Sequence, residues 1–302
     1  MTVSSATGTL PQRVLGKTGE KVPILGLGTA PGGMGMDDDA AIELFEMAID
    51  AGVTYLDTAP GYERAQAQLA HVLPRRRDEI FLATKVLTSN GKEAIETLEE
   101  NLRVMDTDAV DLCYVHSLGH LDVEQVLAAD GALAGLRDAQ KRGLTRYVGF
   151  TAHHKPAWSE RVLRETDVDV AMFALNFADH YTYGFDRTVL PAAVEQNTGI
   201  AAMKVFGGAM GMKYDTTDAE QARPSAMRAL DADFDHEQAL RWSLTLAGVS
   251  LAVVGMYTAE ELQRNIEWVR RLQPLSQEEQ QALLARGRSF STDWGAHYGD
   301  IE

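Results

Sequence analysis

The sequence contains a single cysteine in 302 residues, Cys113. A disulfide framework, a cysteine-rich zinc site and an iron–sulfur cluster all need several cysteines, so this chain can build none of them. Long apolar runs are also missing, because no run approaches the roughly 20 residues that span a bilayer. The first residues, MTVSSATGTLPQ, have neither the basic nor the apolar stretch of a secretion signal. We therefore expect a cytoplasmic protein that is not anchored in a membrane.

Positive charge is scarce as well. The chain has 28 lysines and arginines against 44 aspartates and glutamates, which gives a formal net charge of −16. An acidic surface repels phosphate backbones and anionic lipid headgroups, which argues against binding to nucleic acids or membranes. We expect the partners to be small molecules. Composition leaves the oligomeric state open between a monomer and a small homo-oligomer.

Apolar residues are plentiful, at 45% of the chain, which is enough for a sizeable core. Between short apolar runs lie stretches in which apolar residues recur every three or four positions, as at Ile95, Leu98, Leu102 and Met105. Runs without polar alternation are typical of strands buried on both faces, and their alternation with helices indicates a parallel sheet covered by helices. The eight runs are residues 24–29, 53–58, 80–85, 109–116, 145–151, 170–176, 199–206 and 250–255.

Two architectures fit this alternation, a closed (β/α)8 TIM barrel and a doubly wound open sheet. Eight units in about 240 residues, with no linker between them, favour the barrel and a single domain over residues 1–302. The preceding segment, RVLGKTGEKVPILG, predicts a small β-hairpin at the bottom of the barrel. After Pro274 we expect one more helix, SQEEQQALLARG, and then an aromatic tail, SFSTDWGAHYGDIE.

Four polar side chains stand at or just after the ends of predicted strands. Asp57, Lys85 and His116 end the second, third and fourth runs, and Tyr62 follows Asp57 in a Pro-Gly turn. Catalytic groups of parallel barrels gather at the carboxyl ends of the strands. A lysine ammonium near a phenol favours the phenolate, and a carboxylate holds the lysine charged. A neutral histidine can donate a hydrogen bond to a carbonyl. Each residue alone has an ordinary structural explanation, but together they favour a catalytic site.

Other motifs do not support a different chemistry. The pairs His116 with His120 and His153 with His154 have no third ligand in helical register, and the Lys85 ammonium opposes a bound cation, so we predict no metal site. The glycine-rich residues 26–33 do not match a dinucleotide fingerprint, and we expect a βα loop without a helix there.

The quoted residues resemble the aldo-keto reductase family. Its Asp, Tyr, Lys and His are matched by DTAPGY (57–62), ATK (83–85) and DLCYVH (111–116). The resemblance extends to LGLGT at the first strand, to TLEENLRVMDTDAVDLCYVH (97–116), to RGLTRYVGFTAHH (142–154) and to SLAVVGMYTAEELQRNI (250–266). It departs from the family pattern at YERAQ (62–66), at Thr151-Ala152 in place of Ser-Asn, and at Met172 in place of a glutamine.

The resemblance implies an NAD(P)H-dependent oxidoreductase that reversibly reduces the carbonyl of an aldehyde or ketone to an alcohol. Tyr62 would be the general acid, tuned by Lys85 and Asp57, and His116 would orient the carbonyl. Two other functional hypotheses remain. One is a cofactor-binding, redox-sensing regulatory subunit, and the other is a Schiff-base aldolase in which Lys85 is the nucleophile.

The same resemblance implies a set of cofactor contacts. In members that strongly prefer NADPH, basic residues after the eighth strand hold the 2′-phosphate, whereas here Glu261 stands near that position and Arg264 lies one turn away. We expect weak discrimination, with NADP(H) favoured and NAD(H) a contender. The expected contacts are Gly28, Thr29, Thr151, His153, Asn176, Lys204, Gly255, Met256, Thr258, Glu261, Arg264 and Asn265.

The substrate pocket should be walled by βα loops and the C-terminal tail. Neither the physiological substrate nor the direction of the reaction can be predicted from the sequence. The side chains expected to line the pocket are Met34, Leu118, His120, Phe177, Trp294 and Tyr298.

Overall fold

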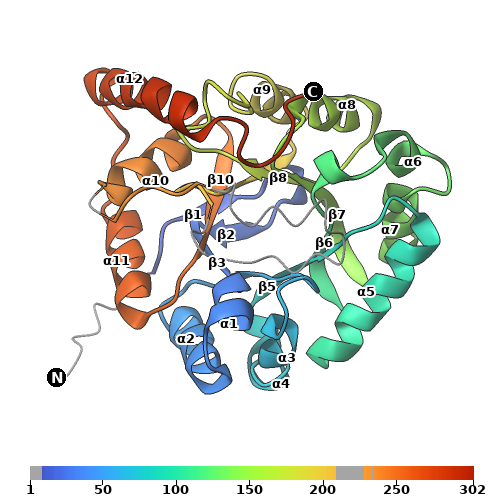
Figure 1. Ribbon diagram of the computed structural model, residues 1–302. Helices are drawn as coiled ribbons and strands as arrows, with labels where there is room; N and C mark the ends of the chain where they lie inside the picture. The colour runs from blue at the N-terminus through green and yellow to red at the C-terminus, as the bar shows by residue number, and fades with distance from the viewer. Residues whose placement is uncertain (1–8, 209–227, 233) are drawn as a thin grey trace.

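A closed barrel of eight parallel strands forms the centre of the protein in the computed structural model, which describes residues 9–208, 228–232 and 234–302. The strands follow one another around the barrel in sequence order, and the last pairs with the first (Figure 1). The predicted TIM barrel is therefore confirmed. Its strands are β3 (Leu25–Gly28), β4 (Tyr55–Asp57), β5 (Phe81–Val86), β6 (Val110–Val115), β7 (Thr145–Ala152), β8 (Val170–Ala174), β9 (Gly199–Met203) and β10 (Val249–Gly255).

Helices surround the barrel because their apolar stripes pack against the outer face of the sheet. In α5, Leu98, Leu102 and Met105 are buried, and the side chain of Asn90 caps the first turn by accepting hydrogen bonds from two backbone N–H groups. The helices are α1 (Ala30–Gly35), α2 (Asp38–Asp50), α3 (Ala65–Leu69), α4 (Leu73–Arg76), α5 (Gly91–Met105), α6 (Val123–Leu127), α7 (Ala132–Lys141), α8 (Pro156–Glu165), α9 (Val189–Glu195), α10 (His236–Thr245), α11 (Ala259–Arg270) and α12 (Gln277–Trp294).

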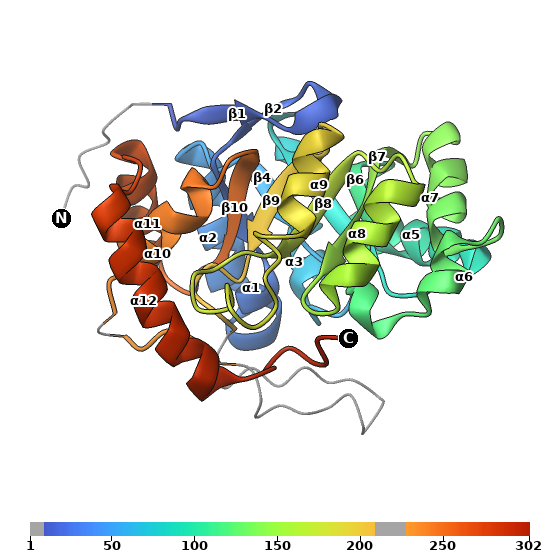
Figure 2. The same cartoon turned by 90° about the horizontal axis from the view of Figure 1, so that it is seen from above.

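The two ends of the barrel are covered differently. The predicted hairpin, β1 (Gln12–Val14) with β2 (Lys21–Pro23), lies at one end, and the C-terminal tail lies at the other (Figure 2). Leu15 and Val22 of the hairpin join the apolar cluster inside the barrel. The hairpin therefore closes the bottom of the barrel, and the carboxyl ends of the strands face the tail.

Two segments differ from the sequence-based expectation. A short helix, α1, occupies the loop after β3 that was expected to lack one, and the Arg64 guanidinium donates hydrogen bonds to the carbonyls of Gly33 and Met36 at its C-terminal end. Such a cation near the last carbonyls favours a helical turn. The final helix, α12, starts at a Ser276–Glu279 capping box and continues to Trp294, so the tail begins later than expected.

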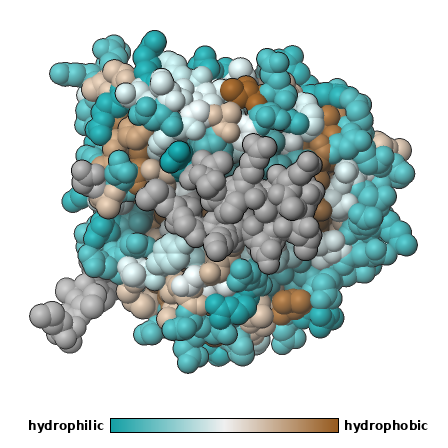
Figure 3. All heavy atoms as spheres, in the orientation of Figure 1, coloured by the Kyte–Doolittle hydropathy of each residue, from teal (hydrophilic) through white to brown (hydrophobic). Residues whose placement is uncertain are grey.

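On the face seen in Figure 3, hydrophilic residues predominate around the rim, with a few hydrophobic patches. Within the described residues, no helix combines the length and the apolar character needed to cross a membrane.

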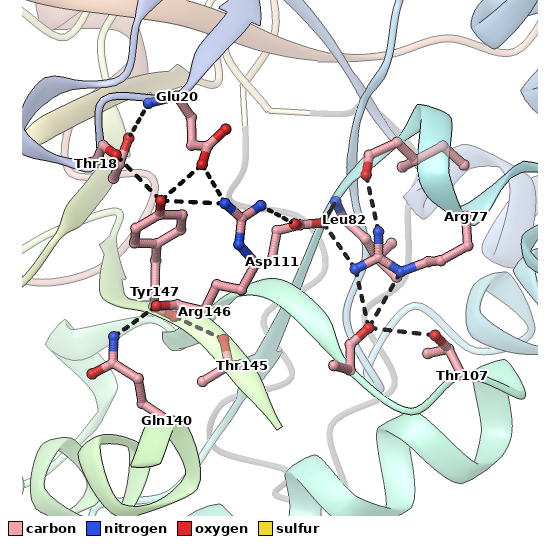
Figure 4. Close-up of polar contacts among 12 residues, drawn as sticks. Thr18, Glu20, Arg77, Leu82, Thr107, Asp111, Gln140, Thr145, Arg146 and Tyr147 are labelled. Atoms are coloured by element: carbon pink, nitrogen blue, oxygen red, sulfur yellow. Dashed lines mark hydrogen bonds and ion pairs between the residues drawn. The ribbon is translucent and has the colours of Figure 1, made fainter. Parts of the chain in front are cut away.

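A charged network fixes the bottom of the barrel (Figure 4). The Asp111 carboxylate is nearly buried and accepts a hydrogen bond from the Leu82 N–H at 2.8 Å. It also forms ion pairs with Arg77 at 2.9 Å and with Arg146 at 2.8 Å, and Arg146 reaches Glu20 of the hairpin. The network therefore joins β5, β6 and β7 to the hairpin, far from the carboxyl ends of the strands.

Because Asp111 serves three donors, we expect Asp111→Asn to lower the free energy of unfolding by about 2–3 kcal/mol in urea titrations. Glu100→Gln is the matched control, since Glu100 forms only an exposed pair with Arg103 and should change stability by less than about 0.5 kcal/mol. Equal stability of the two variants would contradict the role given to Asp111.

Candidate active site

The four residues predicted from strand ends come together at the carboxyl end of the barrel. Asp57 is the last residue of β4, Lys85 is next to last in β5, and His116 directly follows β6. Parallel pairing sets Asp57 beside Ala83 and Lys85 beside Tyr114, so the functional side chains rise from adjacent strands.

Lys85 is the centre of this group. Its Nζ lies 2.5 Å from Oδ2 of Asp57, 2.9 Å from the Thr58 carbonyl oxygen and 3.2 Å from Oη of Tyr62. The side chain is only 1% exposed, so the ammonium depends on these partners for its charge. This places a buried positive charge at hydrogen-bond distance from a phenol, an arrangement that stabilises the phenolate.

The Asp57 carboxyl is buried together with Lys85. Burial raises the pKa of Asp57, while the positive charges of Lys85 and, more weakly, Lys204 oppose this rise. Only one carboxylate oxygen is used by Lys85, and Oδ1 is buried without a hydrogen-bond partner among the described residues.

His116 is held in its neutral form. Burial lowers its pKa well below the ordinary value, and the nearby Lys85 and Lys204 ammonium groups lower it further. A neutral imidazole can donate one N–H bond without carrying charge. Its ring is perpendicular to that of Tyr62, with centroids 6.3 Å apart, so the imidazole and the phenol lie next to each other at this end of the barrel.

The loop that departs from the family pattern after Tyr62 is well anchored. Gln66 is buried and donates to Thr84 at 3.0 Å, and Arg64 donates to the Met36 carbonyl at 2.7 Å. These contacts connect the Tyr62 loop to β5 and to α1. Sequence reasoning noted both residues only as departures, because their partners lie on other elements.

The three side chains expected near the nicotinamide carboxamide have partners within the protein. Thr151 Oγ1 accepts from the Ser117 N–H at 2.8 Å, and His153 Nδ1 lies 3.2 Å from Ser117 Oγ. The Asn176 amide donates to Asp179 at 2.7 Å and to the Lys204 carbonyl at 3.1 Å. A hydrogen bond donated by Asn176 to a ligand would have to replace one of these bonds, whereas Asn176 Oδ1 accepts only from the Asp179 N–H at 2.8 Å.

The segment expected to hold the rest of the cofactor lies where β10 meets β3. Gly28 and Gly255 are paired there, and Thr258 caps α11 by accepting from the Glu261 N–H at 3.1 Å. Thr29 and Met256 are buried, and the Met256 side chain packs in the main core. The contact of Met256 with the cofactor stays a prediction.

Two charged groups of α11 are engaged by neighbours. Glu261 accepts a hydrogen bond from the Tyr257 N–H at 2.7 Å, and Arg264 pairs with Glu260 at 2.6 Å on the exposed surface. Asn265 donates to the Glu261 carbonyl, while its Oδ1 is buried with no partner among the described residues.

The residues expected to line the substrate pocket divide into two groups. Leu118 and Phe177 are fully buried: Leu118 belongs to the main core, and Phe177 stacks on Phe234 with centroids 5.3 Å apart. Their place in the lining of the substrate pocket stays a prediction. Met34, Trp294 and the exposed His120 remain partly accessible at this end of the barrel.

Tyr298 approaches the site from the C-terminal tail. Its ring centroid is 6.0 Å from that of His153, which is 6.4 Å from that of His116. Tyr183 holds this part of the tail, because its Oη accepts from the Tyr298 N–H at 2.8 Å and donates to the Gly299 carbonyl at 3.0 Å.

A second contact anchors the tail, since His297 Nε2 lies 3.0 Å from Asp179 Oδ1 and both side chains are buried. Sequence reasoning missed Tyr183, Asp179 and His297, and no local pattern in the sequence distinguishes them.

Comparisons with known proteins identify the family and similar folds. The aldo/keto reductase family profile matches residues 24–285. L-galactose dehydrogenase of Arabidopsis thaliana is 22% identical over 94% of this chain and 98% of its own. D-threo-aldose 1-dehydrogenase of a Pseudomonas species is 28% identical over 64% of this chain and 68% of its own. An aldo-keto reductase of Klebsiella pneumoniae, solved in complex with NADPH, has a TM-score of 0.70 at 19% identity, covering 91% of this chain and 94% of that one. The chain belongs to the aldo/keto reductase family.

Proposed function

We propose that this protein is an NAD(P)H-dependent oxidoreductase that reduces the carbonyl group of an aldehyde or ketone to an alcohol, and also runs the reverse reaction. The observation that carries the proposal is the buried chain from Asp57 through Lys85 to the Tyr62 hydroxyl, at 2.5 and 3.2 Å, beside a neutral His116.

Each of the four side chains has a defined role in carbonyl reduction. Tyr62 donates its proton to the carbonyl oxygen, and the Lys85 ammonium stabilises the phenolate that remains. Asp57 holds Lys85 charged and directed at the phenol. His116 donates a hydrogen bond that orients the carbonyl oxygen. The nicotinamide, when bound, supplies the hydride that the carbonyl carbon receives.

The described residues fit a dinucleotide. The paired glycines 28 and 255 bring no side chain of their own to this point, and the Pro31 ring lies against Gly255, where an added Cβ would be 2.8 Å from its Cγ. The unpartnered, buried Asn265 Oδ1 is an acceptor suited to the amino group of an adenine. The N-terminus of α11 presents backbone N–H groups, which favour phosphate oxygens.

The experiment is oxidation of NADPH or NADH, followed by loss of nicotinamide absorbance, with a panel that includes 4-nitrobenzaldehyde and methylglyoxal. Two relatives are named as dehydrogenases of L-galactose and of D-threo-aldoses, so we include these sugars with the oxidised cofactors. Turnover of at least one compound is expected. No turnover across the panel would contradict the proposal.

The two alternative functions would give different experimental results. A Schiff-base aldolase would give a stable adduct on Lys85 after borohydride reduction with a carbonyl compound, whereas the ion pair with Asp57 keeps this amine charged and unreactive. A regulatory subunit would retain cofactor tightly and turn it over hardly at all.

For the cofactor, we propose NADP(H) with NAD(H) as a competitor. The family resemblance and the NADPH complex of the Klebsiella pneumoniae protein support NADP(H). The Glu261 carboxylate at the start of α11 disfavours a 2′-phosphate and can accept from ribose hydroxyls, while Arg264 is paired with Glu260.

We therefore expect kcat/KM with one aldehyde to favour NADPH over NADH by well under about 10³-fold. Glu261→Gln should increase this preference by removing a negative charge, whereas Glu267→Gln, two turns along the same helix, should leave it unchanged. A wild-type preference above about 10³-fold would show that Glu261 does not face the ribose.

A further inference from the structure

Two tyrosines meet inside the barrel just below the proposed active site. Tyr55 of β4 and Tyr114 of β6 are both 0% exposed, and their hydroxyl oxygens lie 2.8 Å apart. Tyr55 is two residues before Asp57 on one strand, and Tyr114 is two residues before His116. Side chains two apart on a strand share a face, so the phenols point into the same interior as the catalytic groups.

The barrel provides space for both rings. A Cβ added at Gly26 of β3 would lie 2.9 Å from Cδ1 of Tyr55, and one added at Gly149 of β7 would lie 2.2 Å from the Val170 carbonyl oxygen and 2.8 Å from Cδ1 of Tyr114. Each phenol therefore occupies volume that a larger residue on a nearby strand would fill. Leucine or phenylalanine would supply the same packing without bringing two hydroxyl groups into the core. Packing alone therefore does not explain why the two residues are tyrosines.

The two tyrosine hydroxyls cannot use all of their hydrogen-bond donors on each other. Each phenol has one hydrogen to donate, and the bond between them uses only one. Neither hydroxyl has a second hydrogen-bond partner among the described residues. A buried O–H without an acceptor is costly. The Asp57 Oδ1 atom, on the same face of β4, is a buried acceptor that has no donor in the described part of the chain.

The protonation states of these groups allow the unused phenol hydrogen to pair with the unpartnered Asp57 Oδ1. Burial raises the pKa of Tyr55 well above its ordinary value and the Asp57 carboxylate raises it further; the pKa of Tyr114 is raised by burial, by Tyr55 and by Asp57. Both phenols therefore stay protonated and remain donors. Other polar or charged groups that interact with the Asp57–Lys85 pair include the Thr58 carbonyl, Tyr62, Cys113, His116 and Lys204.

We propose that Tyr55 and Tyr114 are positioning residues for the proposed catalytic site: Tyr114 donates to Tyr55, and the remaining hydrogen, that of Tyr55, is available to Oδ1 of Asp57, although these two atoms are not in hydrogen-bond contact in the structure. The added bond keeps the Asp57 carboxylate ionised and aligned on Lys85, which in turn holds its charge beside Tyr62. Tyr55 is assigned as the donor to Asp57 because its hydrogen is left over when Tyr114 donates to it, and because Tyr55 and Asp57 lie on the same face of β4. The catalytic part of this inference rests on the proposed function, whereas the bond to Asp57 does not.

The direct test is the titration of the Asp57 carboxyl carbon by ¹³C NMR, with its signal assigned from its loss in Asp57→Asn. A hydrogen bond to a carboxylate favours the charged form, so Tyr55→Phe should raise the pKa of Asp57 by about one pH unit. Tyr114→Phe leaves the Tyr55 donor in place and should cause a smaller rise. Tyr147→Phe is the control, because that hydroxyl contacts Thr18 and Glu20 at the bottom of the barrel.

The same variants are then assayed for carbonyl reduction across pH. Charged Asp57 is the active form, so a higher Asp57 pKa in Tyr55→Phe moves the acid limb of kcat/KM to higher pH by about one unit, while the limb of Tyr147→Phe stays in place. An Asp57 titration that is the same in Tyr55→Phe as in wild type overturns the inference, whatever the activity. A shifted titration without any turnover supports the bond and instead contradicts the proposed function.

Discussion

Replacing Tyr62 by phenylalanine should lower kcat for aldehyde reduction by about 10² to 10⁴-fold, the usual cost of removing a general acid. The phenol that lies 3.2 Å from Lys85 Nζ is the proton donor in the proposed reaction, and phenylalanine keeps the ring but not the proton. The dissociation constant of the reduced cofactor, measured by fluorescence titration, should change little, because the hydroxyl acts on the substrate oxygen.

Tyr147→Phe is the matched control for this experiment, since it removes a hydroxyl at the opposite end of the barrel. Its kcat should equal that of the wild type. If Tyr62→Phe retains more than a tenth of the wild-type kcat, another group supplies the proton and the assignment of Tyr62 is wrong.

The second large effect is expected for Lys85→Met, which should reduce kcat at least as much as Tyr62→Phe. This change removes the charge beside the phenol and also leaves the buried Asp57 carboxyl without its ion-pair partner. Breaking a buried pair commonly costs about 3–5 kcal/mol, so the midpoint of urea unfolding should fall as well.

A second substitution separates these two consequences. Asp57→Asn combined with Lys85→Met removes the unpaired carboxyl, and we expect it to recover part of the lost stability without recovering activity. Activity that returns together with stability would mean that Lys85 is important for folding alone. The comparison uses kcat and urea unfolding of both variants.

Much of the barrel could be predicted from local sequence. Runs such as residues 109–116 and 145–151 have the composition of strands buried on both faces, and the helical spacing of Leu98, Leu102 and Met105 marks the buried stripe of α5. Because parallel strands bring their carboxyl ends to one rim, the positions of Asp57, Lys85 and His116 also followed from strand order.

The parts that could not be predicted depend on contacts between distant elements. The burial of Phe177 requires Phe234 and Phe290 from later segments. Helix α12 continues to Trp294, through residues that the sequence analysis had assigned to the C-terminal tail.

The contact between Tyr55 and Tyr114 depends on the relative register of β4 and β6, which are separated by β5. Neither strand reveals this contact in its own sequence. Likewise, the partners of Asn176 are known only once the loop after β8 is folded beside Lys204.

The measurement that tests the proposed function most directly is the mass of the alcohol formed from an aldehyde with NADPH or NADH in which both hydrogens at C4 of the nicotinamide are replaced by deuterium. If the protein binds the carbonyl beside the cofactor and Tyr62 supplies only the proton, the product should contain one deuterium on the former carbonyl carbon. An alcohol formed without deuterium, or no alcohol from any aldehyde or ketone tested, would contradict this account.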